Sequence, residues 1–428
     1  MGAFSLLAMA FLMLTDSLSA QAQTQIKTKT FPPPSDLPVS LLMLNPFLTL
    51  DGAGPTSLDD WPAHREYLKE LMQHYLYGHI PPRPSWNELS FRQISDESYS
   101  PPKLSIQGRR QAYEVTVTRN GLSHSFNFAL YRQSEVKPYP TLINNRVDDS
   151  FGPEEGVRRG YLFVEFNREE VAPDEADNAD RSEGIFRLYP EPEYDWHTIA
   201  AWAWAYQLVI DVVDSLGLVD TGKIMVTGHS RGGQTAMAAA IFDERIDVTA
   251  PSTGGPFSLG SHRQRDPEGF RGTDDYPARF KARQPHWYHP RYGEFSGDLQ
   301  KNMPWDVPTL VALVAPRAIC HVNSVDDNIN NWLAHEVGIR VGQLIYSWWD
   351  KEDLVRMHWR GVSNDYGQTG HDQGREEYEA IYDCGDEYFY GTPGATSWNV
   401  SPGKNTWEYD PAEYPLLIDW TIPGAGEK

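Results

Sequence analysis

A serine, two aspartates and a histidine follow one another along this chain in an order that suits nucleophilic catalysis. Ser230 stands in Gly228-His229-Ser230-Arg231-Gly232, between the apolar run 224–226 and the alanine-rich segment 234–242. A serine hydroxyl becomes an effective nucleophile when a histidine takes its proton and a carboxylate orients the imidazolium. Gly-x-Ser-x-Gly between a strand and a helix is typical of a sharp turn that exposes the serine. The pattern predicts a serine hydrolase, with a Gly- and Ser-rich loop on an ordinary α/β domain as the alternative.

The candidate acid and base lie downstream of the serine. The apolar run 318–323 predicts a strand, and Asp326 and Asp327 follow its end. Asp326 has the better spacing for a catalytic carboxylate and Asp327 is the second choice, although either could cap the next helix instead. His371, in a Gly-rich loop before the helix-like run 376–389, is the candidate base, and His358 is its rival. The order serine, acid, histidine is that of α/β-hydrolases.

The segment His286-Trp287-Tyr288-His289 could suggest a metal site. No acidic or cysteine ligand falls at supporting spacing, so we expect a structural or substrate-lining role for it. We expect neither a metal nor a cofactor.

The elements around these residues predict the fold class. From about residue 140, strand-like runs (140–144, 160–166, 223–227 and 317–323) alternate with helical ones such as 195–216. This alternation predicts an α/β protein with a mostly parallel sheet covered by helices on both faces, the three-layer α/β-hydrolase sandwich. A helix at 61–77 and a hairpin, 111–118 with 123–132 around Asn120-Gly121, are expected before it.

Length and termini predict one catalytic domain. Residues 4–14 are apolar but too short to span a membrane, and Ala20-Gln21-Ala22 fits a cleavage site. We expect a signal peptide at 1–22, a single domain at 23–428 with an insertion at about 253–305 over the site, and a secreted or periplasmic protein. Cys320 lies in an apolar strand and is expected to be a buried free thiol, although export would permit a disulfide with Cys384.

Composition limits the partners. The formal net charge is −22, from 59 acidic and 37 basic residues, which argues against nucleic acid and anionic membranes. The 14 Trp and 22 Tyr suit stacking against sugar rings, although most are expected in the core. We expect a monomer acting on a polysaccharide or oligosaccharide ester.

Several motifs together resemble a known family. They are 43–82, Asp195-Trp196, Trp202-Ala203-Trp204, Gly228-His229-Ser230-Arg231, Pro285-His286-Trp287, 313–317 and Gly370-His371-Asp372. The chain resembles the glucuronoyl esterases, carbohydrate esterase family 15, especially its bacterial branch. The resemblance implies hydrolysis of esters of (4-O-methyl)glucuronic acid, as in lignin–carbohydrate linkages of glucuronoxylan, through an acyl-enzyme on Ser230. It also implies that Arg231 stabilises the oxyanion and that Gln234 and Trp287 contact substrate.

Three positions depart from the family pattern. Thr253, 23 residues after the serine, stands where many members carry a glutamate, which leaves Asp326 as the expected acid. Gln234 replaces a frequent lysine, and Ile329 stands about where a tryptophan is common. The alternatives are therefore an acetyl-xylan or other carbohydrate esterase, a prolyl-oligopeptidase-like hydrolase, or a non-catalytic sugar-binding relative.

Overall fold

The structure is a computed structural model that describes residues 30–101, 106–147, 150–265, 275–327, 329–361, 370–401 and 413–424. The chain divides into two units, Met1–Phe31 and Pro32–Lys428, and the fold described below belongs to the second. The expected signal peptide at 1–22 lies outside the described residues. Among the residues that are described, none of the helices combines the length and the apolar character needed to cross a bilayer.

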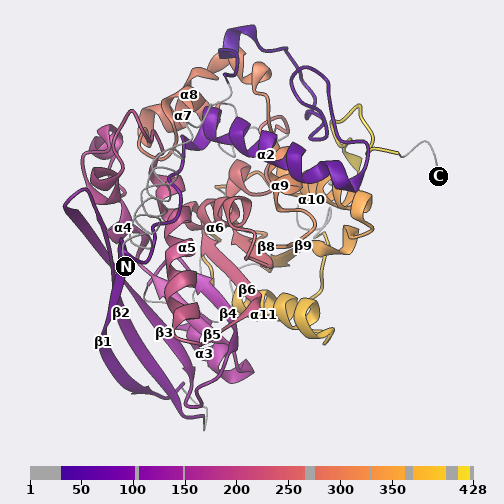
Figure 1. The fold of residues 1–428 in the computed structure, drawn as a ribbon. Coiled ribbons are helices and arrows are strands. Elements are labelled where there is room, and N and C mark those ends of the chain that lie inside the picture. Colours follow the sequence, from indigo (N-terminus) through magenta and orange to yellow (C-terminus); the bar gives the residue numbers. More distant parts are fainter. Residues whose placement is uncertain are drawn as a thin grey trace, which may run out of the picture. The chain divides into compact units, whose positions relative to one another are not determined.

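Within the described residues, nine strands form one mixed sheet in the order β1-β2-β3-β5-β4-β6-β7-β8-β9 (Figure 1). Strands β1, β2, β3 and β5 pair antiparallel, and from β5 to β9 every pairing is parallel. The strands are β1 (Leu89–Tyr99), β2 (Gly108–Arg119), β3 (Leu122–Gln133), β4 (Tyr139–Asn144), β5 (Leu162–Phe166), β6 (Val219–His229), β7 (Val248–Ser252), β8 (Ala318–Ser324) and β9 (Val355–Arg360).

The predicted hairpin is confirmed. Arg119 of β2 pairs with Leu122 of β3, and the two turn residues Asn120 and Gly121 have φ values of 53° and 76°. A two-residue turn with both φ values positive matches the twist of the flanking strands, and Asn-Gly adopts it readily. Strand β1 was not predicted, because only its first residue, Leu89, is buried and the rest of the strand is largely polar.

Helices cover both faces of the sheet. Met225 and Cys320 pack in a core cluster with side chains of α11, whereas the hydroxyl of Thr249 donates to the carbonyl of Ala236 in α6. Val248, the neighbour of Thr249 in β7, belongs to the cluster with Met225 and Cys320. Because neighbouring residues of a strand point to opposite faces, α11 and α6 lie on different sides of the sheet. Helix α3 packs with α11, and α5, α9 and α10 belong to the α6 side. The three-layer α/β-hydrolase prediction is confirmed.

The α-helices of the described residues match most of the predicted ones in position. The predicted insertion at 253–305 contains α7 and α8. The helices are α2 (Trp61–Met72), α3 (Phe151–Arg159), α4 (Arg168–Val171), α5 (Thr198–Ser215), α6 (Arg231–Phe242), α7 (Tyr276–Arg283), α8 (Pro290–Glu294), α9 (Val307–Val314), α10 (Trp332–Tyr346) and α11 (Arg375–Tyr390).

A disulfide joins Cys320 of β8 to Cys384 of α11, with 6.5 Å between the Cα atoms. The expectation of a free thiol at Cys320 was wrong. Its side chain points to the α11 face of the sheet, where Cys384 is also buried. Sequence spacing alone could not reveal this proximity.

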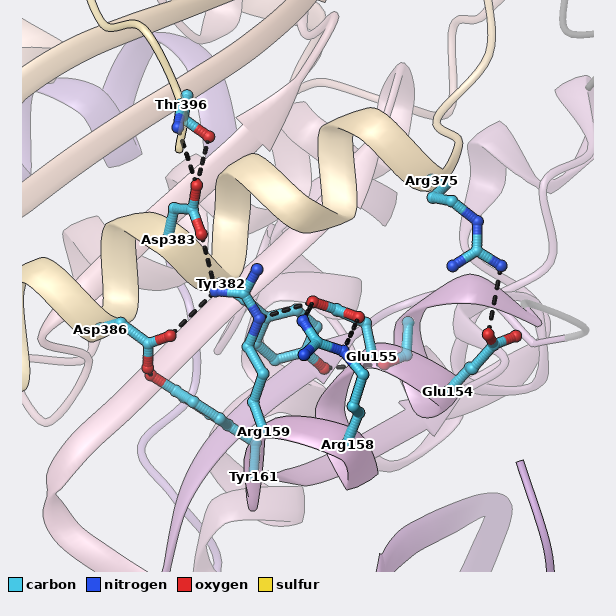
Figure 2. A network of polar contacts seen from close by, with 11 residues as sticks. Glu154, Glu155, Arg158, Arg159, Tyr161, Arg375, Tyr382, Asp383, Asp386 and Thr396 are labelled. Carbon is cyan, nitrogen blue, oxygen red and sulfur yellow. Dashed lines mark hydrogen bonds and ion pairs between the residues drawn. The ribbon is translucent and has the colours of Figure 1, made fainter. Parts of the chain in front are cut away.

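A network of ion pairs holds α3 against α11 (Figure 2). The Arg159 guanidinium lies 2.7 Å from Asp383 and 2.9 Å from Asp386, and Arg375 lies 3.2 Å from Glu154. Helix α3 follows the loop after β4, and α11 follows the loop that carries His371. The network therefore holds together the helix that follows the β4 loop and the helix that follows the His371 loop.

Candidate active site

Ser230 occupies a strained turn between β6 and α6. Its φ is 56° and its ψ is −120°, a conformation that is rare for a residue with a side chain. Its N–H donates to the carbonyl of Ser252 in the neighbouring strand at 2.9 Å. Gly228 is required before the turn, since an added Cβ would collide with the backbone of Gly232. The residue types thus produce the predicted elbow at the carboxyl edge of the sheet.

His371 lies between the serine and a carboxylate. Its Nε2 is 3.1 Å from Ser230 Oγ, and its Nδ1 is 3.1 Å from Asp327 Oδ2. The preceding Gly370 packs against the backbone of the Asp326–Asp327 turn so closely that a Cβ could not be accommodated. This close approach brings together the loops that carry the histidine and the acid.

Asp327 is a fully buried carboxylate with defined partners. The backbone N–H of Ile329 donates to Oδ1 at 2.9 Å, and the amide of Asn330 donates to Oδ2 at 2.7 Å. Burial raises the pKa of Asp327, but the hydrogen bond and charge of His371 outweigh it, and the pKa lies below its usual value. A carboxylate in this setting stays ionised and can stabilise an imidazolium.

The preference for Asp326 over Asp327 does not agree with this geometry. The Ser324 hydroxyl donates to Oδ1 of Asp326, within the turn that follows β8. Asp327, the next residue of the turn, points its side chain inward, toward the donors of Ile329 and Asn330. It is therefore Asp327 that accepts the hydrogen bond from His371. Asp327 replaces Asp326 as the candidate acid.

Arg231, directly after the serine, forms an ion pair with Asp174. Its guanidinium carbon lies 5.0 Å from the ring centroid of Trp287. The Arg231 side chain is 40% exposed, whereas that of Asp174 is 7% exposed. The guanidinium is therefore held by buried groups and still accessible to a ligand.

A pocket of about 80 Å³ opens beside the serine. Gln234 lies in the first turn of α6, and its Oε1 accepts a hydrogen bond from the Tyr288 hydroxyl at 2.7 Å. Trp287 comes from the segment between α7 and α8 of the insertion. The lining residues are Ser230, Gln234, Thr253, Gly255, Pro256, Tyr276, Arg279, Phe280, Gln284, Trp287, Ile329, Asn330 and His371.

Two side chains that the sequence did not single out as site residues lie in this region. His229 is half-buried with its ring 4.7 Å from that of His371, and desolvation together with the charge of His371 lowers its pKa to about 3. Asp174 follows the short helix α4 in an acidic segment without a recognisable motif. Only the fold shows that each of them contacts a candidate site residue.

Thr253 lies at the end of β7, within the same pocket as Ser230. Its hydroxyl donates to Asn323 Oδ1 of β8 at 3.2 Å, and its φ is 55°. This position borders the site but holds a group that cannot ionise. Asp327 is thus the carboxylate that contacts His371 in the described structure.

The remaining histidine candidates each have an acidic partner other than Asp327. His358 Nε2 is 3.2 Å from Glu376, His286 Nε2 is 2.9 Å from Asp174, and His289 Nε2 is 3.2 Å from Asp195. In the part of the chain that the structure describes, no three His, Cys, Asp or Glu side chains are grouped as metal ligands.

Comparison with known proteins identifies related sequences. The family model for fungal glucuronyl esterases matches residues 115–350, more than half of the chain. A 4-O-methyl-glucuronoyl methylesterase from Podospora anserina is 27% identical over 293 residues, which cover 68% of this chain and 56% of that protein. The chain thus spans little more than half the length of this curated relative. The match to the fungal model does not support the narrower expectation of the bacterial branch.

Solved structures share the fold. A family 15 glucuronoyl esterase from Caldicellulosiruptor kristjansonii has a TM-score of 0.70 at 22% identity, covering 90% of this chain and 98% of that one. A serine-to-alanine variant of the glucuronoyl esterase from Sporotrichum thermophile, in complex with methyl 4-O-methyl-β-D-glucopyranuronate, has a TM-score of 0.62 at 18% identity. It covers 91% of this chain and 100% of the other.

Proposed function

The chain belongs to the glucuronyl esterase family, and on that premise we propose that it hydrolyses esters of (4-O-methyl)glucuronic acid. The observation that carries the proposal is the continuous hydrogen-bonded arrangement of Ser230, His371 and Asp327. Arg231 beside the nucleophile and the polar pocket next to it are consistent with an ester that belongs to a sugar.

The reaction follows from the positions of these groups. Ser230 Oγ attacks the uronoyl carbonyl carbon while its proton passes to His371 Nε2. Asp327 accepts the Nδ1 hydrogen bond and stabilises the imidazolium that forms. The imidazolium then protonates the departing alcohol and leaves a glucuronoyl ester on Ser230. Water, deprotonated by the same histidine, attacks that ester, and the imidazolium returns the proton to Ser230 Oγ as the uronic acid is released.

Negative charge develops on the carbonyl oxygen in both steps. Arg231 and Gly232 begin α6, and the N–H groups at the start of a helix carry the positive end of its dipole. The Arg231 guanidinium adds a full charge beside them. Removing one such donor costs on the order of 3 kcal/mol of transition-state stabilisation.

The substrate class rests on related proteins and on the pocket. The Podospora relative is named a 4-O-methyl-glucuronoyl methylesterase, and the Sporotrichum enzyme binds a methyl glucuronate ester. The pocket of about 80 Å³ is smaller than a typical small-molecule site of roughly 300 Å³ or more. It suits part of a uronate with Gln234 and Trp287 beside it, while the alcohol and the rest of a polysaccharide stay outside.

A comparison of ester classes on one purified sample tests this function. We expect cleavage of benzyl and methyl glucuronate, and loss of turnover in Ser230→Ala and His371→Ala. Asp180→Asn, an exposed change elsewhere on the chain, serves as the matched control. Cleavage of aryl acetates, with no cleavage of uronate esters, would instead favour an acetyl esterase. Sugar binding without turnover of any ester would favour a non-catalytic relative.

We also propose that the protein works outside the cytoplasm, as a monomer. The Cys320–Cys384 disulfide supports an oxidising compartment. Comparing the mass of the protein purified from culture medium or periplasm with that of the full chain tests whether residues 1–22 are removed.

A further inference from the structure

One buried carboxylate connects two residues of the candidate site that come from different parts of the chain. Asp174 lies in the segment after α4, Arg231 begins α6, and Trp287 belongs to the insertion. Asp174 Oδ2 pairs with Arg231, and Oδ1 accepts from Trp287 Nε1 at 2.7 Å. His286 Nε2 lies 2.9 Å from the same Oδ1.

We propose that Asp174 is a positioning residue that holds the Arg231 guanidinium at the developing oxyanion and the Trp287 indole at the wall of the pocket. This inference rests on the proposed function of the same site. Asp174 acts through its two partners and does not itself touch the reacting atoms.

The first argument is that Arg231 needs to be held. An arginine side chain has roughly 2 kcal/mol of rotamer entropy to lose, and the Arg231 side chain is 40% exposed. The ion pair with Asp174 and the face of Trp287 restrict the guanidinium from two directions. A donor that is already in place when charge develops stabilises the transition state without reorganisation.

The second argument is electrostatic. Arg168 is buried nearby, stacked on Trp202, and burial followed by the charge of Arg231 lowers the pKa of Arg168. Two guanidinium groups in one region repel each other, and the negative charges of Glu169 and Asp174 offset that repulsion at Arg168. Hydrogen bonds from His286 and Trp287, with the charge of Arg231, outweigh the burial of Asp174 and keep its pKa well below the usual range. The carboxylate is therefore charged at every pH at which the enzyme would work.

The third argument concerns the pocket. The indole N–H of Trp287 has a single hydrogen to donate, and it goes to Asp174 Oδ1. This bond fixes the rotation of the ring that lines the pocket beside Ser230. One carboxylate thus sets both the group that stabilises charge and the surface against which the sugar packs.

A double-mutant cycle tests the proposal. Asp174→Asn preserves the volume and an oxygen that can accept from Trp287, but removes the charge that pairs with Arg231. We expect kcat to fall by tenfold to a hundredfold with KM changed by less than about threefold, because a misplaced catalytic group costs up to about 10²-fold. In an Arg231→Gln background the same substitution should lower kcat by less than about threefold.

Asp180→Asn is the matched control, because this exposed aspartate belongs to the same segment of the chain. Asp174→Glu restores the charge and should recover part of the lost kcat. If the asparagine variant does not fold, Asp174→Ser, which also removes the charge, takes its place in the cycle. Equal losses of kcat in the two backgrounds, or no recovery with glutamate, would overturn the positioning role. The cycle is run on whichever ester the unmodified enzyme cleaves, so a different substrate class would refute the proposed function alone.

Discussion

Replacing Asp327 by asparagine is the sharpest test of the catalytic arrangement. Oδ2 of Asp327 accepts from both Asn330 and His371, and Oδ1 accepts from the N–H of Ile329. An asparagine in this place offers one acceptor oxygen and one NH₂ group. If the oxygen stays with Ile329, the NH₂ faces His371 and Asn330; if the amide flips, the NH₂ faces the N–H of Ile329.

The first arrangement changes the chemistry of the histidine. An NH₂ facing Nδ1 of His371 favours the tautomer with the hydrogen on Nε2, and this nitrogen then cannot take the proton of Ser230. The equivalent change in a serine protease triad lowers kcat by about 10⁴, or about 5.5 kcal/mol of activation free energy. We expect kcat to fall by about 10³- to 10⁴-fold for Asp327→Asn, because the Asp327 carboxylate, like the aspartate of the protease triad, is buried.

The assay compares Asp327→Asn with Asp326→Asn in steady-state hydrolysis of benzyl glucuronate, with thermal unfolding as the test of folding. Asp326 is the adjacent residue with the same side chain, and Ser324 donates to it inside the turn. We expect the Asp326 variant to keep kcat within about tenfold of the unmodified enzyme. An Asp327 variant with more than a tenth of normal kcat, or an Asp326 variant with the 10³-fold loss, would refute the reasoning.

Two further predictions concern stability. Replacing Cys320 and Cys384 together by alanine should lower the free energy of unfolding by about 4 kcal/mol, since the bridge closes a loop with a sequence separation of 64; unchanged denaturant midpoints with and without the bridge would contradict this. Thermal stability should also fall as the pH is lowered from 7 to 5. Burial, with the charges of neighbouring histidines, lowers the pKa of His229 and His197 to about 3, whereas their pKa in the unfolded chain is about 6.5. Between these values the unfolded state binds more protons, so stability rises with pH. His229→Gln should weaken this dependence in calorimetric scans, and equal midpoints at pH 5 and 7 would contradict it.

Local patterns predicted much of the fold and part of the site. Asn120-Gly121 specified a hairpin, and Gly228 to Gly232 specified the elbow, because both depend on backbone conformations that few residues adopt. Strand β1 was missed because a largely polar edge strand has no apolar alternation to recognise.

The sequence placed the candidate acid within one residue but preferred Asp326 to its neighbour Asp327. Which of Asp326 and Asp327 turns inward depends on donors from Ile329 and Asn330 and on the approach of Gly370 from a distant loop. Asp174 and the pairing of Cys320 with Cys384 were missed for a related reason. The Asp174–Arg231 ion pair and the Cys320–Cys384 bond each join segments that are far apart in the sequence.

The Cys320–Cys384 bond closes a covalent ring of chain that includes Asp327 and His371 and leaves Ser230 outside. The ring runs through β8 and β9, so the loops that carry Asp327 and His371 are joined by a covalent bond in addition to the sheet, whereas Ser230 lies in the strand–helix turn outside the ring. A cell interior that keeps thiols reduced would produce the elbow without this tether. Formation of the disulfide in an oxidising compartment would then restrict the segment that carries Asp327 and His371 and leave the turn at Ser230 as it is.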